Sequence, residues 1–276
     1  MRDELGNRMK YFYETIPKTK LMRRTPVAIR LDGKSFHTFT RGFKKPFDMT
    51  LSQSMRDTMK HLCENIQGCV LGYTQSDEIT LILCDYQTLD TCAWFDYEVQ
   101  KMCSISASMA TRAFEKAFRQ NIESYVTYFK NNVDEEYVMR LKEAINNIDN
   151  AMFDSRCFNI PKEEVANLLY WRELDCMRNS VSMMARCYFS DKELFKKSTN
   201  DKIDMLLEKG HDYYKETPLC YQRGSCCLKA IDRVNRNNFV SPWYIDDKIP
   251  VFKEDGREYV ERRIRFDKYN NKGENI

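Results

Sequence analysis

The chain has 276 residues, of which 42% are hydrophobic and 31% are charged, and its formal net charge is +3. It contains no run of 18 apolar residues and no apolar segment near its start, so we expect neither a membrane span nor a secretory signal. Aromatic residues make up 13% of the chain, which argues against disorder. The length and composition favour one large or two smaller folded domains.

The charge is unevenly distributed along the chain. Residues 1–60 hold 14 Lys and Arg against 6 Asp and Glu, whereas the remainder is net acidic. A basic front part indicates an anionic partner, such as a triphosphate or a nucleic acid. An ordinary solvated surface is the alternative interpretation of the same pattern.

The cysteines and histidines form no recognisable metal motif. There are 11 Cys and 3 His, and no Cys-x-x-Cys pair occurs, which argues against a zinc ribbon or a thioredoxin-type site. Several cysteines lie in apolar runs, for example Cys84. The pattern predicts buried free thiols and a cytoplasmic protein.

The first predicted elements are a strand and a helix. Alternating side chains over 27–32 predict a strand. Apolar residues at helical spacing predict a helix over 50–67. Thr50 and Gln53 fit a capping box at its start, and Gly68 fits a C-cap at its end.

A hairpin and a long helix follow. We predict strands over 69–73 and 79–84, a hairpin loop over 74–78, and a helix over 91–130. Strand, helix, hairpin and helix in this order indicate an α+β fold in which helices cover one face of a sheet.

The second half is predicted to be mostly helical. The polar segment 131–150 fits a helical surface connection, 153–160 a strand, and 161–187 a helix. We therefore expect a catalytic domain over 1–131 and a C-terminal, mostly helical domain over 132–276.

Three further signals lie near the end of the chain. Ser190 and Glu193 fit a second capping box, and 219–230 fits a hairpin. From Lys253 onward the chain carries seven basic and six acidic residues, which suggests a mobile tail.

Acidic residues stand where the predicted strands end. Asp32 closes the first strand and is followed by Gly33, and Asp77 and Glu78 lie in the predicted hairpin loop. Converging carboxylates could hold hard cations such as Mg²⁺, and a pair of ions would activate an attacking oxygen and neutralise a leaving phosphate. A strand-end cap and a polar turn are the alternative interpretation.

Lysines follow these acids along the chain. Lys34 comes directly after the glycine, Lys45 lies in a basic loop, and Lys101 lies on the long helix. Phosphoryl and nucleotidyl transfer depend on positioning and charge neutralisation, which such lysines could supply. No Walker loop and no Gly-x-Gly-x-x-Gly motif is present, so nucleotide binding would use another scaffold.

Several linked motifs together resemble the tRNA-His guanylyltransferase family. They occur in the family's order over about residues 5–230 and comprise Ile29–Phe39, Phe43–Asp48, Tyr73–Glu78, Trp94–Phe95, Lys101, Phe153–Arg156 and Trp171–Ser180. The resemblance implies an enzyme with a polymerase-palm-like (ferredoxin-like) antiparallel sheet that adds nucleotides in the 3′-to-5′ direction. Helices would pack on this sheet, and the C-terminal half would be helical.

The resemblance also implies a set of site residues. Asp32, Asp77 and the Gly33 carbonyl would bind two Mg²⁺ ions, and Glu78 would be a third catalytic carboxylate. The nucleoside triphosphate would be held by Asp32, Gly33, Lys34, Ser35, Phe36, His37, Lys45, Asp48, Ser76, Asp77 and Lys101.

The substrates implied are tRNA and nucleoside triphosphates. Family members activate a 5′-monophosphate with ATP, and the 3′-hydroxyl of GTP or another triphosphate then attacks that end. They act as homotetramers. Eukaryotic members carry His-Ile-Asn-Asn where this chain has Met177-Arg178-Asn179-Ser180, and only Asn179 matches. The chain is thus more similar to bacterial and archaeal members that repair truncated tRNA by templated addition, with Arg178 and Asn179 as weak tRNA-binding candidates.

Two other classes stay open on the sequence. A palm-type nucleotide cyclase or small-molecule nucleotidyltransferase would share the two aspartates and need no RNA. A catalytically silent RNA-binding module would not need the acids, yet Asp32, Asp77 and Glu78 are all present.

Overall fold

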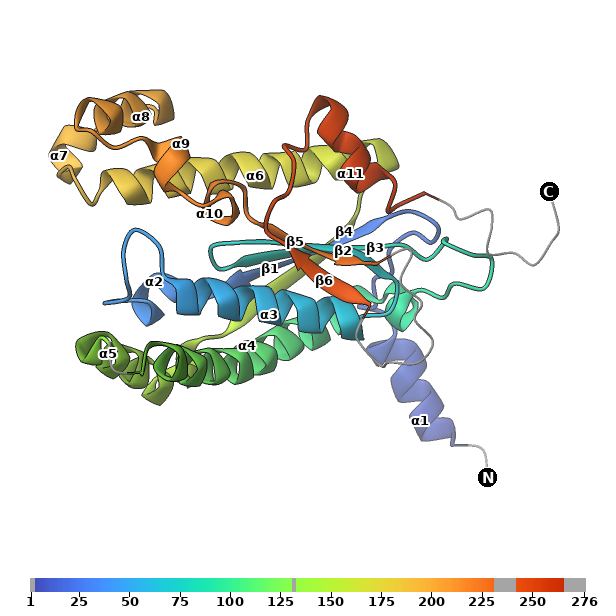
Figure 1. Ribbon diagram of the computed structural model, residues 1–276. Helices are drawn as coiled ribbons and strands as arrows, with labels where there is room; N and C mark the ends of the chain where they lie inside the picture. Colours follow the sequence, from blue (N-terminus) through green and yellow to red (C-terminus); the bar gives the residue numbers. More distant parts are fainter. Residues whose placement is uncertain (1–2, 131–132, 231–241, 266–276) are drawn as a thin grey trace.

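A computed structural model describes residues 3–130, 133–230 and 242–265 of the chain. Its centre is a six-stranded sheet in the order β4-β1-β3-β2-β5-β6, and every neighbouring pair is antiparallel (Figure 1). The strands are β1 Val27–Gly33, β2 Cys69–Gln75, β3 Glu78–Leu83, β4 Phe153–Asn159, β5 Ser225–Lys229 and β6 Trp243–Asp246. The predicted α+β class and antiparallel sheet are confirmed.

The sheet draws on both halves of the chain. Strands β1, β2 and β3 come from residues before 131, whereas β4, β5 and β6 come from residues after it. Strand β4 pairs with β1 at one side, and β5 pairs with β2 at the other. The sheet therefore crosses the predicted boundary at residue 131.

Two long helices cover one face of this sheet. Helix α3 spans Met49–Asn65 and α4 spans Val99–Phe129. Their apolar side chains, such as Met59 and Phe114, form one core cluster with the β1 residue Ile29, and all three side chains are fully buried. The helical spacing that predicted α3 thus marks residues that pack against the sheet, whereas the buried side of α4 includes Phe114.

A second layer of helices covers the other face (Figure 1). Helix α6, Lys162–Ala185, packs Val165 and Leu169 in one cluster with Ala28 of the sheet. Helix α11, Arg257–Glu261, adds Val260 to the same cluster. The expectation of a mobile tail is therefore wrong for residues 253–265, because its apolar positions complete a core, and 266–276 lie outside the described residues.

The boundaries of several elements differ from the prediction. Asp48, not Thr50, caps α3, because its carboxylate accepts the Leu51 N–H at 2.9 Å. The hairpin turn is only residues 76 and 77, because β2 and β3 extend up to it. Residues 91–98 do not join α4; Trp94–Tyr97 form a separate 3₁₀ turn.

Short helices make up the rest of the described chain. Residues 219–223 form a helical turn instead of a strand; Gly224, with a φ of +86°, ends that turn, and β5 begins at Ser225. The capping box of Ser190 and Glu193 is confirmed. The remaining elements are α1 Glu4–Met9, η1 Lys10–Glu14, α2 Phe36–Phe39, η2 Trp94–Tyr97, α5 Glu135–Asn146, η4 Ile148–Asn150, α7 Asp191–Leu194, α8 Thr199–Glu208, α9 Tyr213–Glu216, α10 Leu219–Arg223 and η5 Glu254–Gly256.

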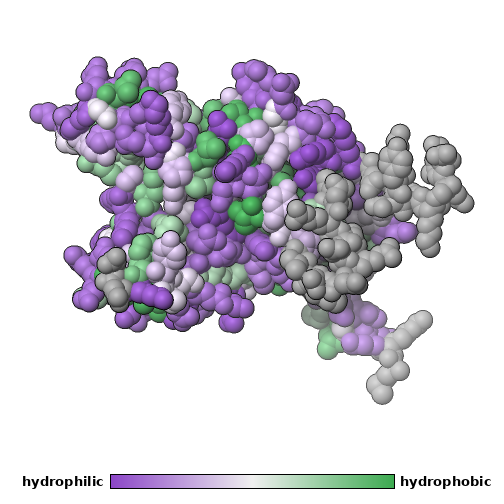
Figure 2. All heavy atoms as spheres, in the orientation of Figure 1, coloured by the Kyte–Doolittle hydropathy of each residue, from purple (hydrophilic) through white to green (hydrophobic). Residues whose placement is uncertain are grey.

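Two broader expectations can be compared with the structure. All eleven cysteines are free thiols, as predicted, but the expected burial holds for only six of them, because Cys92 and Cys187 are exposed and three others are half-buried. Among the described residues, no helix has the length and apolarity needed to cross a membrane. Figure 2 shows that the face in view is mostly hydrophilic and is indented between the α7–α8 end above and the α5 end below.

Candidate active site

The end of β1 and the β2–β3 turn bring the predicted acids together. Asp32 lies opposite Glu78 of β3 in the strand register. The Gly33 N–H donates a hydrogen bond to the Asp77 carbonyl oxygen at 3.0 Å. The turn is tight because Ser76 has a φ of +50°, and the Ser76 hydroxyl donates to the Asp77 carboxylate at 3.0 Å. Five predicted site residues, 32, 33 and 76–78, therefore meet at one edge of the sheet.

The electrostatics of the two aspartates favour a bound cation. Burial raises the pKa of Asp32, and the neighbouring carboxylates of Glu78 and Asp154 raise it further. Burial likewise raises the pKa of Asp77, against a lowering effect of its hydrogen bond from Ser76. Within the described residues, the Asp32 carboxylate has no hydrogen bond or ion pair. Two crowded carboxylates with raised pKa values gain most from a cation that offsets their charge.

The residues present fit a hard metal ion of the magnesium kind. Asp32 and Asp77 offer carboxylate oxygens, and Gly33, which follows Asp32 and contacts the Asp77 backbone, offers a backbone carbonyl; these are the donor types that Mg²⁺ prefers. Over 3–130, 133–230 and 242–265 there is no cluster of three or more His, Cys, Asp or Glu side chains suited to a metal. A metal ion here would therefore have two carboxylates as side-chain donors, and its other ligands would be backbone, substrate or water oxygens.

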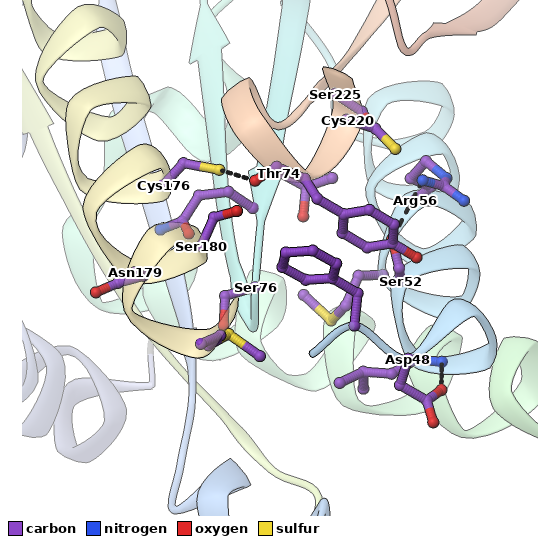
Figure 3. A pocket seen from close by; sticks show the side chains of 16 residues that line it. Asp48, Ser52, Arg56, Thr74, Ser76, Cys176, Asn179, Ser180, Cys220 and Ser225 are labelled. Carbon is purple, nitrogen blue, oxygen red and sulfur yellow. Dashed lines mark hydrogen bonds between the residues drawn. The ribbon is translucent and has the colours of Figure 1, made fainter. Parts of the chain in front are cut away.

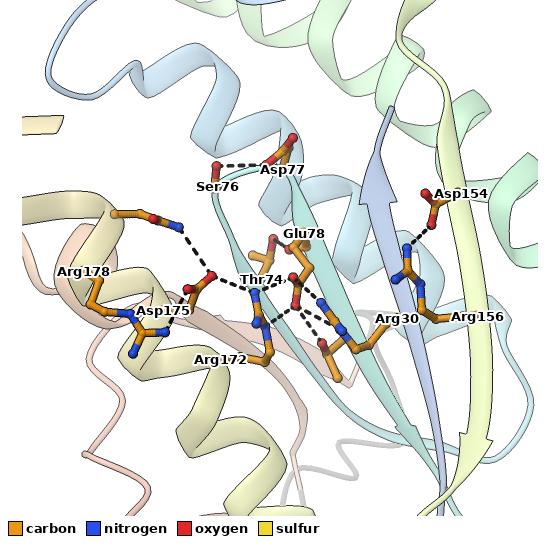
Figure 4. Close-up of polar contacts among 12 residues, drawn as sticks. Arg30, Thr74, Ser76, Asp77, Glu78, Asp154, Arg156, Arg172, Asp175 and Arg178 are labelled. Carbon is orange, nitrogen blue, oxygen red and sulfur yellow. Dashed lines mark hydrogen bonds and ion pairs between the residues drawn. The ribbon is translucent and has the colours of Figure 1, made fainter. Parts of the chain in front are cut away.

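Glu78 has different partners from the two aspartates. It is a buried strand residue instead of a loop residue, and both of its oxygens are bound by Arg172, whose Nε and Nη2 each lie 2.7 Å away (Figure 4). Arg30 of β1 adds a contact from its Nη2 at 2.7 Å. The structure therefore pairs this predicted catalytic carboxylate with two arginines.

The contacts of Arg172 form an arginine network that continues along α6. Arg172 also donates to Asp175 at 2.9 Å, and Asp175 accepts from Arg178 at 3.0 Å and from Asn179 at 3.4 Å (Figure 4). The two predicted tRNA-binding residues are therefore linked to the β3 acid through Arg172 and Asp175. Sequence reasoning missed Arg30, Arg172 and Asp175 as site residues, because 94 positions separate Arg172 from Glu78.

Strand β4 contributes a further acid that sequence reasoning did not single out. Asp154 lies opposite Asp32 in the β1–β4 register. Its carboxylate accepts a hydrogen bond from Arg156 at 2.8 Å. Asp154 lies within the motif Phe153–Arg156 that resembles the family, but only the strand pairing shows that it lies opposite Asp32.

The loop after β1 divides into exposed and buried residues. Lys34, Ser35 and His37 are exposed, whereas Phe36 is 2% exposed and packs in the core with Phe114. A Cβ on Gly33 would lie 2.4 Å from the Phe36 ring, so this position requires glycine. The described structure thus gives Phe36 a packing role, and leaves the other three free to face a ligand.

The loop before α3 holds Asp48 firmly. Its carboxylate caps α3, accepts the Lys44 N–H at 3.0 Å and accepts the Tyr137 hydroxyl at 2.8 Å. Asp48 is buried, so these contacts fix the loop instead of presenting the carboxylate to solvent. Lys45 in the same loop is exposed.

Lys101 is not brought to the acids of its own chain. Thr111 of α4 contacts β4 beside Gly33, since its hydroxyl accepts the Phe153 N–H at 3.2 Å. Lys101 lies ten residues earlier, about 15 Å along the helix at 1.5 Å per residue. There it faces Glu98 at 3.7 Å.

A small cavity lies beside the turn, between α3, α6 and α10 (Figure 3). Its volume is about 100 Å³, and Ser76 and Asn179 are among its lining residues. The rings of Phe47 and Tyr221, which also line it, stack at 4.4 Å. The cavity is smaller than the roughly 300 Å³ of an ordinary ligand pocket.

An antiparallel sheet that carries two aspartates beside a basic loop is typical of a palm-type nucleotidyltransferase. The sequence model of the tRNAHis guanylyltransferase family matches residues 6–161. The chain therefore belongs to the tRNA-His guanylyltransferase family, whose members are nucleotidyltransferases.

Similar proteins support this assignment. A bacterial tRNA(His) guanylyltransferase-like protein in complex with ATP matches with a TM-score of 0.77 and 37% identity, over 95% of this chain and 99% of that chain. A complex with GTP matches with a TM-score of 0.75 and 34% identity, over 96% of this chain and 100% of that chain. A probable tRNA(His) guanylyltransferase of Dictyostelium discoideum is 25% identical over 76% of this chain and 77% of its own length. The palm-like fold expected from the sequence is consistent with these matches.

Proposed function

We propose that the chain is a template-dependent 3′-to-5′ nucleotidyltransferase that repairs the 5′ end of tRNA. The observation that carries this proposal is the meeting of Asp32 and Asp77, both with raised pKa values, beside the exposed loop residues Lys34, Ser35 and His37. Membership of the tRNA-His guanylyltransferase family supports tRNA as the acceptor.

The reaction needs a site that positions two nucleotides and offsets their charge. Asp32, Asp77 and the Gly33 carbonyl would hold two Mg²⁺ ions, which when bound would neutralise the phosphates and activate the attacking hydroxyl. Lys34, Ser35 and Lys45 would orient the triphosphate by charge and hydrogen bonds. ATP would first activate the 5′-monophosphate, and the incoming GTP or other triphosphate would then be joined through its 3′-hydroxyl.

The arginine network would align this site with the acceptor. Arg178 and Asn179 lie on the exposed side of α6, where they would contact tRNA, and Asp175 links them to Arg172. Templated addition needs no surface that selects one tRNA, since base pairing supplies the sequence information. As in the family, we propose action as a homotetramer in the cytoplasm.

Template dependence gives the central experiment. A 5′-truncated tRNA should regain its missing nucleotide only when the added triphosphate pairs with the opposing base. The measurement is product length and identity on labelled truncated and full-length tRNA, with each triphosphate in turn and Mg²⁺. Efficient addition of G to intact tRNA-His, with no activity on truncated acceptors, would instead indicate a fixed guanylyltransferase.

The same assay without RNA tests the alternative class. A palm-type cyclase or small-molecule nucleotidyltransferase would consume triphosphate and release pyrophosphate with no RNA present. We expect pyrophosphate release to depend on added RNA, because the basic loop and the arginine network to α6 are suited to an RNA end.

Replacement of Lys45 by Ala is expected to raise the KM for the triphosphate about tenfold. The loss of one charge-assisted contact corresponds to about 1.5 kcal/mol. Steady-state kinetics with ATP and with the added triphosphate measure the change. Lys101→Ala is the comparison, because the structure places Lys101 away from the acids of its own chain; an equal effect there would show that the triphosphate is reached by both lysines.

A further inference from the structure

Helix α5 contacts the loop that precedes α3. The Tyr137 hydroxyl donates to the Asp48 carboxylate at 2.8 Å, and Lys44 Nζ lies 4.3 Å from the centre of the Tyr137 ring. Lys44 also pairs at 3.3 Å with Asp134, which caps α5. The polar segment around 131–150 is therefore not a mere surface connection, because its buried face joins the core and fixes this loop.

A neighbouring side of helix α5 lines a cavity together with the loop that follows β1. The cavity has a volume of about 560 Å³, and its lining includes Lys34 and Ser35 before α2, Arg41 after it, and Arg140 and Asn147 from α5 and its C-cap. This volume lies within the range of ligand pockets, about 300–1,000 Å³. Ser35 and Lys34 come directly after Gly33, so the cavity begins beside the candidate metal site.

The charge of the cavity favours an anion. Lys34, Arg41 and Arg140 line it, against the single carboxylate of Glu143. Lys34 and Arg41 have no side-chain hydrogen bond or ion pair among the residues that the structure describes. Arg140 pairs with Glu143 at 3.2 Å and with Glu136 at 3.9 Å. Such exposed pairs contribute little to stability, so an anionic ligand could replace them.

We propose that this cavity is a phosphate-binding site for a nucleotide substrate, with Arg41 and Arg140 as its contacting residues. The inference rests on the proposed function, because a nucleotidyl-transfer site adjoins the cavity. Guanidinium groups bind phosphate oxygens in a bidentate manner, which suits the two arginines that line the cavity. The phosphates belong either to the triphosphate or to the 5′ end of the acceptor RNA, and the two sources are separable by experiment.

The test compares Arg41→Ala and Arg140→Ala with Lys142→Ala in the full-length protein. Lys142 is an exposed cation of α5 that does not line the cavity, so its replacement controls for the general loss of charge. Titration calorimetry with inorganic tripolyphosphate and filter binding with 5′-monophosphorylated truncated tRNA measure the two sources. Thermal melting by circular dichroism confirms that each variant is folded.

We expect each arginine variant to bind one of the two probes about tenfold more weakly, with Lys142→Ala unchanged. Weaker tripolyphosphate binding assigns the cavity to the triphosphate. Weaker RNA binding with a reduced salt dependence assigns it to the acceptor. Unchanged binding of both probes by folded variants overturns the proposal. Because neither readout needs turnover, wild-type protein that adds no nucleotide would contradict the proposed function alone.

Discussion

Asp32→Asn and Asp77→Asn are each expected to abolish nucleotide addition while preserving the fold. Each change removes one of the two carboxylates that would hold the metal ions, and an amide cannot replace that charge. Both side chains lie at the sheet edge and only half-buried, so no core packing is lost. The measurement is product formation on truncated tRNA over a range of Mg²⁺ concentrations.

The stability of the Asp32 variant should stay the same or increase, although its activity is lost. Since the pKa of Asp32 is raised in the folded state, the folded protein holds this proton more tightly than the unfolded chain does. Ionisation of Asp32 therefore costs stability above the raised pKa, and this cost is absent below the ordinary carboxyl pKa of about 3.9. We expect Asp32→Asn to match or exceed the wild-type free energy of unfolding at pH 7 without metal, with the difference shrinking as the pH falls.

A matched variant distinguishes loss of the site from loss of a surface charge. Asp204→Asn changes an exposed carboxylate of α8, far along the chain from the turn, and should leave both activity and stability unchanged. Near-normal turnover by Asp32→Asn or Asp77→Asn, with unaltered Mg²⁺ dependence, would show that the metal site is assigned to the wrong residues.

In the wild type, activity should rise with pH as the carboxyl groups of Asp32 and Asp77 ionise.

Arg172→Ala is expected to lower the free energy of unfolding by about 3–5 kcal/mol, because it leaves Glu78 buried with one of its charged partners missing. Glu78 and Arg172 are 5% and 6% exposed, and their contact is bidentate at 2.7 Å. Arg172→Lys keeps the charge but cannot reproduce the two parallel hydrogen bonds, so its loss should be intermediate. Urea denaturation measures each free energy. Arg119→Ala, which breaks an exposed pair on α4, should cost less than about 1 kcal/mol.

Glu78→Gln then separates a structural role from metal binding. If Glu78 acts through Arg30 and Arg172, the variant should be less stable, while the Mg²⁺ concentration for half-maximal activity stays unchanged. If Glu78 is a metal ligand as the family resemblance implies, that Mg²⁺ concentration should rise sharply. A stable Arg172→Ala variant with wild-type unfolding would contradict the buried ion pair itself.

The order of strands and helices in the first half follows from the sequence, because local periodicity reports which side chains face a core. Alternation over 27–32 and helical spacing over 50–67 correspond to β1 and α3. The acids Asp32 and Asp77 could be singled out for the same reason, since each lies where a predicted strand ends. Short-range patterns did not show where these elements begin and end. For example, the N-cap of α3 is Asp48 and not Thr50.

Only the tertiary structure decided which distant residues meet. The pairing of β4 with β1 sets Asp154 opposite Asp32, and the packing of α6 on the sheet brings Arg172 to Glu78. These contacts join positions separated by about a hundred residues, and they depend on burial of whole faces of the sheet instead of on any local pattern. The sequence therefore determined the two aspartates of the candidate metal site. The fold determined that arginines neutralise Glu78, and that α5 lines a basic cavity next to the loop that follows Asp32 and Gly33.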